Sequence, residues 1–303
     1  MLVRWGLEEL PGLLDDVGIE RPFLVAGRRW DGLAIPATAR WTEVPSDRIE
    51  VPREVDGILA VGGGSTIDTA KAASAASSLP LVSVPTTYSG AEWTAFFGVR
   101  TPERRQVGGG SGARLAGIVY DAELTLDLPR AESGGTALNA LAHCVEALYP
   151  GELEVARRGA SGIDRWLPLV LEDGRDLEAR THLLEAASEA GQALAAHGLY
   201  LAHAMAQALG GRYGLPHGAM NALCLPPAMR FNAETVPRAM TAVPVERVEE
   251  LARLAGFERL RDFGIPAEEL DDVAVVAAGR PGARANPRPA PPAEIAELLR
   301  SIW

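Results

Sequence analysis

Residues 57–71 read GILAVGGGSTIDTAK and pass from an apolar run through three glycines into an alanine-rich segment that extends to Ser77. The apolar run predicts a buried strand, and the alanine-rich segment predicts a helix. Glycines at this junction let backbone N–H groups approach a phosphate, and the dipole of the helix adds positive potential. The stretch therefore predicts an anion-binding loop in an α/β fold, although three glycines also suit an ordinary tight turn.

The residues around the glycines favour the anion-binding interpretation. Ser65 is expected to cap the helix, Asp68 to lie in its first turn, and Lys71, the only lysine in the chain, to lie two turns in. A further apolar run at 81–84 predicts a strand that leads into the hydroxyl-rich loop 85–92. Such a loop suits the binding of a ribose or a pyrophosphate, and the alternative is an ordinary polar loop.

The pattern of elements changes from α/β to all-helical along the chain. A short helix at 7–18 and a buried strand at 22–27 are expected to open the α/β part. In the second part, Ser133 is the expected N-cap of the first helix, and small residues over 178–209 predict one long helix. Further helices are expected at 164–173, 222–232, 245–255 and 292–302, with the proline-rich segment 281–292 as a rigid connector.

The composition narrows the class of protein. The 303 residues carry a formal net charge of −11 and no long Lys/Arg run, which excludes nucleic acid and anionic membrane surfaces as partners. Cys144 and Cys224 are too few for a disulfide framework, and no segment approaches ~18 uninterrupted apolar residues. Because Met1–Gly6 show no signal pattern, the sequence predicts a cytoplasmic protein that acts on a small molecule.

Two of the five histidines, His203 and His217, flank a turn that contains glycines and begins at Gly210 and Gly211. A helix that ends in such a turn can direct two imidazoles to one point, so this pair is the first candidate for catalysis. A histidine on an apolar helix is more often a hydrogen-bonded core residue than a ligand, and the pair alone does not define a site.

Four motifs together resemble the iron-containing (group III) alcohol dehydrogenase family. They are GGGSxxDxxK at 62–71, PTTxxGxE at 85–92, YDxxLTLxLP at 120–129 and NALAHxVEALY at 139–149, and the last two point to the maleylacetate reductase branch. The resemblance implies the dehydroquinate synthase-like architecture of this family. It comprises an α/β Rossmann-like dinucleotide-binding domain over 1–130, an all-α domain over 131–303, an active site between them, and a homodimer formed through the first domain.

The resemblance also implies that NAD or NADP is bound by the first domain. The residues expected to contact it are Gly62, Gly63, Gly64, Ser65 and Asp68 on the pyrophosphate side and Thr86, Thr87 and Ser89 on the nicotinamide side. The region expected to bind the adenosine is abbreviated, because three prolines interrupt any long helix over 31–54. The choice between NAD and NADP therefore stays open. Gln106 stands where relatives carry a lysine, with Arg105 as a candidate replacement.

Four residues match the positions that bind a divalent metal in metal-using relatives: Asn139, His143, His203 and His217. Three imidazoles suit zinc or iron. Relatives that bind metal have an aspartate where this chain has Asn139, and the amide removes the only negative charge from the set. The maleylacetate reductase branch tends to have asparagine here and is regarded as independent of metal, so the metal-free state is favoured over the metal-bound one.

Two further departures concern catalysis and the substrate. Gln207 stands where relatives have histidine, and either keeps a hydrogen bond or marks the loss of a proton relay. Ala204 stands where the reductase branch has lysine, so a dianionic substrate needs another cation, with Arg212, Arg230 or another arginine as candidates.

The leading hypothesis is an NAD(P)H-dependent oxidoreductase that resembles maleylacetate reductase and transfers hydride to a small carbonyl or enoyl acid. Its expected catalytic residues are Asn139, His143, His203, Gln207 and His217. The alternative is a family member that has lost redox chemistry and acts as a lyase, isomerase or cyclase through the same histidines. A catalytically silent binding protein is a third hypothesis, which fits less well because the three histidines are retained.

Overall fold

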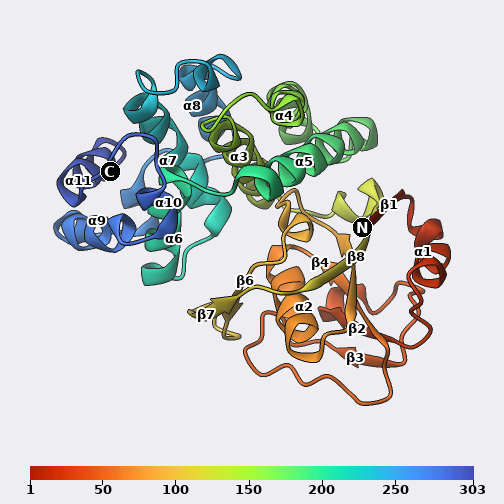
Figure 1. Cartoon of the computed structure of the whole chain (residues 1–303). Helices are drawn as coiled ribbons and strands as arrows, with labels where there is room; N and C mark the ends of the chain where they lie inside the picture. The colour runs from red at the N-terminus through yellow and green to blue at the C-terminus, as the bar shows by residue number, and fades with distance from the viewer. The chain divides into compact units, whose positions relative to one another are not determined.

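The computed structural model describes all 303 residues, which form two compact units, Met1–Leu126 and Asp127–Trp303 (Figure 1). The first unit is an α/β structure and the second is helical. The fold class expected from the motifs is thereby confirmed.

The first unit is built on a six-stranded sheet in which every pair of neighbouring strands is parallel. In spatial order the strands are β1 (Leu2–Trp5), β8 (Arg114–Tyr120), β5 (Pro80–Pro85), β4 (Gly57–Gly62), β2 (Pro22–Ala26) and β3 (Ala39–Trp41). The central strands β2 and β4 are buried along their whole length, because both faces of the sheet are covered. This explains why they are continuous apolar runs in the sequence.

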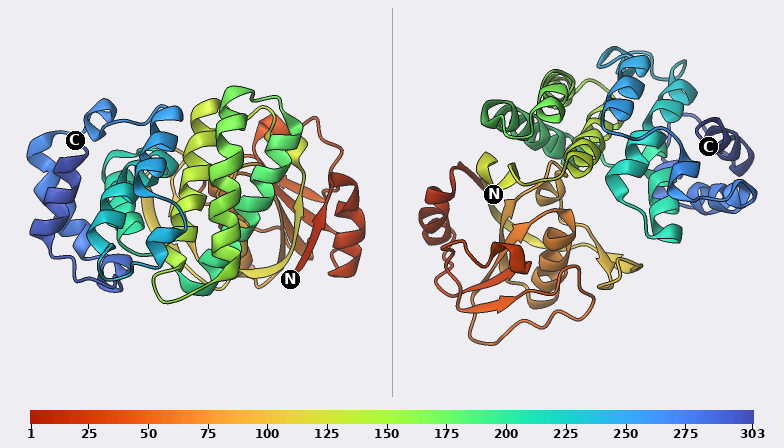
Figure 2. Two further views of the ribbon diagram at one scale, coloured as in Figure 1. Left: turned by 90° about the horizontal axis from the view of Figure 1, so that it is seen from above. Right: turned by 180° about the vertical axis from the view of Figure 1, so that it is seen from behind.

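Each face of this sheet has its own hydrophobic core. Leu10, Leu13 and Leu14 of helix α1 (Leu10–Asp16) pack on one face. Ile67, Ala70 and Ala73 of helix α2 (Gly64–Ser77) pack on the other face, and Figure 2 shows the two helices on opposite sides of the strands. Helix α2 leaves the carboxyl end of β4 directly, so the glycines lie where the central strand ends.

The region 31–54 contains no helix and only the short edge strand β3. Two further strands, β6 (Phe97–Arg100) and β7 (Gln106–Gly110), form a separate antiparallel hairpin. The expected strands at 22–27 and 81–84 correspond to β2 and β5.

The second unit contains the helices α3 (Arg130–Ala147), α4 (Glu154–Glu172), α5 (Leu177–His197), α6 (Leu201–Tyr213), α7 (His217–Asn232), α8 (Val245–Leu254), α9 (Leu270–Ala278), α10 (Pro281–Arg284) and α11 (Pro292–Ser301). The long helices α3, α4 and α5 pack against one another and run side by side in the left view of Figure 2. No helix is both long and apolar enough to cross a membrane.

Three expectations about these helices are wrong. The segment 178–209 is not one helix, because Gly198, with φ 76°, separates α5 from α6. Gly210 and Gly211 lie inside α6, which ends at Gly214 in a left-handed conformation. Ser133 is not an N-cap: α3 begins at Arg130 after Pro129, and the Ser133 hydroxyl donates to the carbonyl of Leu128. The proline-rich connector also contains the short helix α10, for which Pro281 provides the first turn.

Candidate active site

Three helices bring the predicted histidines together. His143 lies on α3, His203 in the first turn of α6, and His217 is the first residue of α7. The rings of His143 and His203 stack with centroids 4.7 Å apart and planes 13° apart, and the rings of His203 and His217 are 5.8 Å apart at 48°. The structure therefore places all three imidazoles in one cluster.

The carboxylate of Glu146 holds His203 in place. Its Oε2 accepts hydrogen bonds from Nδ1 of His203 at 2.7 Å and from the backbone N–H of Tyr200 at 2.8 Å. Its Oε1 accepts from the backbone N–H of Ala202 at 2.7 Å, and both the carboxylate and the imidazole are fully buried. Because this buried carboxylate is the acceptor toward the backbone N–H groups, it is also the acceptor toward the imidazole. Nδ1 of His203 is therefore the donor and carries the proton. The remaining nitrogen, Nε2, is buried and has no protein partner.

Sequence reasoning missed this role of Glu146, although the residue lies inside the fourth motif. The signal was its position three residues after His143, which places both side chains on one face of α3. Nothing in the sequence indicated that the same face meets the start of α6.

A second missed residue, Asn221, links Asn139 to His217. Its side-chain nitrogen donates to Oδ1 of Asn139 at 2.8 Å and lies 2.9 Å from Nε2 of His217. The same nitrogen also lies 3.3 Å from the backbone oxygen of His217. Because an amide nitrogen only donates, its contact with the imidazole makes Nε2 of His217 the acceptor. Asn221 follows His217 by one helical turn, and this spacing could have found it.

His143 is buried beside the other two imidazoles, and its Nδ1 has no partner. Burial lowers its pKa well below the usual value, and the neighbouring His203 and His217 lower the pKa further. The imidazole of His143 is therefore neutral at physiological pH.

The cluster does not fit a divalent metal as it is arranged. An imidazole binds a metal through a lone pair in the plane of its ring, at about 2.1 Å for zinc. The rings of His143 and His203 lie nearly parallel, with planes 13° apart. Asn221 already donates to the oxygen of Asn139, and no group of three or more histidine, cysteine or acidic side chains is placed to hold a metal.

Gln207 lies one turn beyond His203 on α6, and its oxygens are engaged by an arginine from another element. Its side-chain oxygen accepts from Nη1 of Arg280 at 3.4 Å and its backbone oxygen from Nη2 at 3.1 Å. The two arginines named as candidates for binding a dianionic substrate form ion pairs with glutamates instead. Arg212 pairs with Glu269 at 2.7 Å and Arg230 pairs with Glu249 at 2.7 Å, and all four side chains reach the surface.

In the first unit, the glycine loop closes against the loop that follows β5. A Cβ on Gly63 would lie 2.8 Å from Cγ2 of Thr87, and one on Gly62 would lie 2.5 Å from Oγ1 of Thr66. The amide of Thr86 donates to the carbonyl of Gly62 at 3.1 Å. A side chain at Gly63 would therefore push the two loops apart, and one at Gly62 would collide with the first turn of α2.

Helix α2 starts without a side-chain cap, because its N-cap is Gly63. The expectation that Ser65 caps this helix is wrong, since Ser65 already lies within its first turn. Uncapped N–H groups at a helix start suit an anion, and the Thr87 hydroxyl beside them is buried without a partner. Ser89 also adjoins the loop, with its Oγ 3.2 Å from a Cβ built on Gly64. These residues fit the pyrophosphate of a dinucleotide.

Asp68 and Lys71 face the β6 hairpin. Asp68 lies in the second turn of α2, not the first as expected, and accepts from the amide of Gly98 at 3.2 Å. Lys71 donates to Thr94 at 3.1 Å and to the carbonyl of Phe96 at 3.0 Å. Burial raises the pKa of Asp68, against the effect of nearby Lys71, and burial lowers the pKa of Lys71. Both side chains brace this hairpin against α2.

Gln106 and Arg105, the residues discussed in place of a family lysine, are exposed in the β6–β7 hairpin. The Gln106 amide donates to the carbonyl of Gly108 at 3.4 Å, within its own strand. Nη1 of Arg100, in the same hairpin, lies 3.7 Å from Oδ2 of Asp68.

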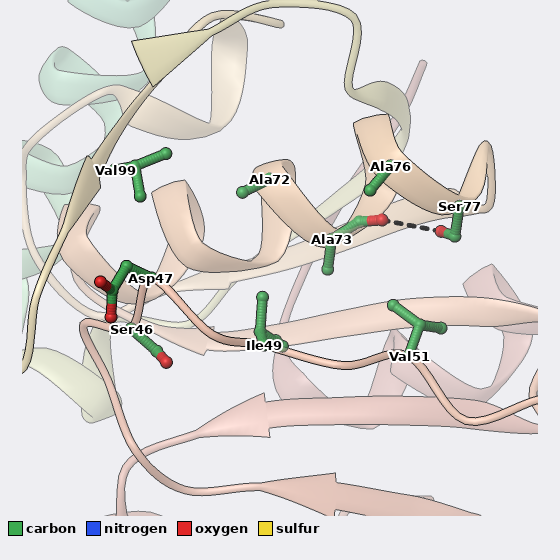
Figure 3. Close-up of a pocket in the computed structure, with 9 residues that line it drawn as sticks. All are labelled: Ser46, Asp47, Ile49, Val51, Ala72, Ala73, Ala76, Ser77 and Val99. Atoms are coloured by element: carbon green, nitrogen blue, oxygen red, sulfur yellow. Dashed lines mark hydrogen bonds between the residues drawn. The ribbon is translucent and has the colours of Figure 1, made fainter. Parts of the chain in front are cut away.

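A cavity of about 410 Å³ lies between α2 and the segment 46–51 (Figure 3). It is lined by Ile49 and Val51 of the abbreviated region, by alanines of α2 and by Val99 of β6, and Asp47 is its only ionisable residue. None of the predicted cofactor-binding residues lines it, so it is separate from the glycine loop.

A parallel sheet with a glycine loop, followed by a helical unit with a histidine cluster, suits an oxidoreductase of the dehydrogenase type. The profile described as "Iron-containing alcohol dehydrogenase" matches residues 50–119, and "Fe-containing alcohol dehydrogenase family, C-terminal" matches residues 134–303. The chain belongs to the iron-containing alcohol dehydrogenase family and resembles its maleylacetate reductases.

Individual relatives agree with this assignment. Maleylacetate reductase from Pseudomonas sp. (strain P51) is 35% identical over 282 residues, which cover 86% of this chain and 79% of the relative. The crystal structure of maleylacetate reductase from Agrobacterium tumefaciens superimposes with a TM-score of 0.86 at 26% identity, covering 100% of this chain and 95% of that one. An iron-containing alcohol dehydrogenase from Corynebacterium glutamicum gives a TM-score of 0.87 at 28% identity, covering 100% and 94%. These relatives do not favour the lyase, isomerase or cyclase alternative.

Proposed function

We propose that this protein is an NAD(P)H-dependent reductase that acts on a small carbonyl or enoyl acid similar to maleylacetate. The observation that carries the proposal is the buried Glu146–His203 pair, which leaves Nε2 of His203 without a partner in a cluster of three imidazoles. The relatives that share most of the chain are maleylacetate reductases, which supports this substrate class.

The glycine loop is the proposed site of the cofactor pyrophosphate. Gly62, Gly63 and Gly64 keep side chains away from it, and the uncapped start of α2 provides N–H donors. Thr87 offers its buried hydroxyl at the edge of this loop. The reduced nicotinamide, when bound, supplies the hydride.

The histidine cluster is the proposed source of the proton. Hydride transfer leaves negative charge on the substrate, and a proton must neutralise it. His203 holds its Nδ1 proton on Glu146, so Nε2 is the nitrogen that delivers and regains the mobile proton. His143 stays neutral because of its low pKa, and it orients and desolvates the site without carrying charge.

We further propose that the reaction needs no metal. The stacked rings of His143 and His203, the amide of Asn139 and the engagement of that amide by Asn221 all support this. In the absence of a metal, hydrogen bonds from protonated imidazole stabilise the developing negative charge.

Titration with NADH and NADPH, followed by the fluorescence of the six tryptophans, tests the proposal. We expect saturable quenching with at least one cofactor, and oxidation of that cofactor at 340 nm when maleylacetate is added. Absence of binding at millimolar concentrations of both cofactors would refute the reductase function.

A further inference from the structure

Arg280 is a partly buried cation that has no acidic partner. Eight other arginines of the helical unit each pair with a carboxylate within 3.0 Å: Arg157, Arg158, Arg175, Arg212, Arg230, Arg247, Arg288 and Arg300. Arg280 forms no ion pair in the structure. Its side chain donates hydrogen bonds only to the two oxygens of Gln207, and its Nε is buried without a partner.

This arrangement lacks a negative charge. A guanidinium stays charged at neutral pH, and withdrawing it from water is costly unless an anion compensates. Two neutral amide oxygens accept some of its hydrogen bonds, but they do not compensate its positive charge. Burial lowers the pKa of Arg280, and no carboxylate lies near enough to oppose this effect. The uncompensated charge of the guanidinium is therefore suited to a ligand that brings an anion.

The position of Arg280 relates this cation to the histidine cluster. Gln207 follows His203 by four residues on α6, so the two side chains lie on one face of the helix, about 6 Å apart along its axis. The backbone of α10 is held close to the start of α6, because a Cβ on Gly282 would lie 2.6 Å from the carbonyl oxygen of Tyr200. Tyr200 is also bound by Glu146, so one short segment positions both Arg280 and His203.

We propose that Arg280, held by Gln207, binds a carboxylate of the substrate and makes the enzyme selective for carboxylated substrates over neutral ones. This inference rests on the reductase function proposed above. The planar guanidinium matches a carboxylate through two parallel hydrogen bonds. It supplies the cation that Arg212 and Arg230, already paired on the surface, do not supply.

The same geometry explains Gln207 itself. An amide oxygen accepts a hydrogen bond from a guanidinium at every pH, whereas an imidazole at this position would repel Arg280 once it was protonated. The glutamine orients the cation and leaves its charge available for the substrate.

Binding of maleate, a dicarboxylate without a keto group, tests the inference in the full-length protein with no NADH or NADPH present. Its Kd is measured by tryptophan fluorescence, beside that of the uncharged dimethyl maleate, for the wild type and for Arg280→Gln. We expect the substitution to weaken maleate binding about 10- to 100-fold, as loss of a charge-assisted pair does, and to leave the weak binding of the ester unchanged. Arg280→Lys should retain part of the affinity, and Gln207→Leu should weaken maleate binding less than Arg280→Gln.

Arg300→Gln is the matched control, because it removes an arginine that Asp271 already neutralises. It should leave maleate binding unchanged. Equal affinity of Arg280→Gln and wild type for maleate, or no binding of maleate by the wild type, would overturn the inference. Thermal melting and NADH affinity of each variant establish that it is folded, and Arg280→Lys serves if Arg280→Gln does not fold. Failure of the reductase function would show differently, as an absence of cofactor binding while maleate binding still depends on Arg280.

Discussion

Glu146 accepts a hydrogen bond of 2.7 Å from Nδ1 of His203, and neither side chain is exposed to solvent. The same carboxylate accepts hydrogen bonds from the backbone amides of Tyr200 and Ala202. It therefore also caps the N-terminus of α6, which has no other side-chain cap. One buried acid thus sets both the position of the helix and the tautomer of the histidine that it carries.

Glu146→Gln should reduce kcat for the reduction by about 10²- to 10³-fold, because the amide turns one N–H donor toward backbone or imidazole donors and disturbs the tautomer of His203. KM for the cofactor should change little. The free energy of unfolding in urea should fall by about 1–3 kcal/mol, since a buried donor loses its acceptor.

Glu172→Gln, on the exposed end of α4, is the control and should change neither quantity. The ¹⁵N chemical shifts of the His203 ring distinguish positioning from mere stability: the wild type should show a protonated Nδ1. An unprotonated Nδ1 in the wild type would contradict the assigned role of Glu146.

Gly63→Ala should weaken the binding of NADH by at least about 10-fold, because its Cβ would lie 2.8 Å from Thr87 and displace the loop that closes on the phosphate site. Gly12→Ala on α1 is a suitable comparison, since a Cβ there meets no atom within 4 Å. It should leave NADH binding intact and raise stability by about 0.5–1 kcal/mol. Fluorescence titration and urea unfolding measure both effects; unchanged affinity of Gly63→Ala would refute the phosphate site.

Treatment with EDTA followed by dialysis should leave the rate of NADH oxidation unchanged, because no group of three or more histidine, cysteine or acidic side chains is placed to hold a metal. Atomic absorption of the dialysed protein should show far less than one equivalent of zinc or iron. A loss of activity that either ion restores would contradict the metal-free mechanism.

The stability of the protein should depend on pH through His143. Burial and the neighbouring imidazoles hold its folded-state pKa well below the usual 6.5. Below pH 6.5 the unfolded chain therefore binds a proton that the folded chain excludes, so the free energy of unfolding falls as the pH decreases, by up to ~1.4 kcal/mol per pH unit. This contribution is absent well above pH 6.5, where both states are neutral.

Urea unfolding of the wild type and of His143→Gln between pH 5 and 8 measures how much His143 contributes to the change in the free energy of unfolding with pH. The variant should show a smaller loss of stability on acidification. Asp68 and Glu92, whose pKa values are raised by burial, titrate in both proteins, so their contribution cancels in the comparison. Identical pH dependence of the two proteins would show that His143 is not held neutral by its surroundings.

Much of the architecture follows from local patterns. The run of apolar residues before Gly62 and the alanines after Ser65 define β4 and α2, because strand and helix depend on neighbouring residues. Helix ends were less predictable. Gly198 breaks the segment 178–209 with a positive φ of 76°, whereas Gly210 and Gly211 stay helical inside α6, although the residue type is the same.

The sequence by itself determined the family, the glycine loop and the three histidines, since these are motifs with fixed spacing. Only the tertiary structure decided how the residues work together. Glu146 and His203 are 57 residues apart, and Arg280 and Gln207 are 73 apart, so no local pattern connects them. Their contacts depend on how α3, α6 and α10 pack, and packing is a property of whole helix surfaces rather than of the spacing within one segment.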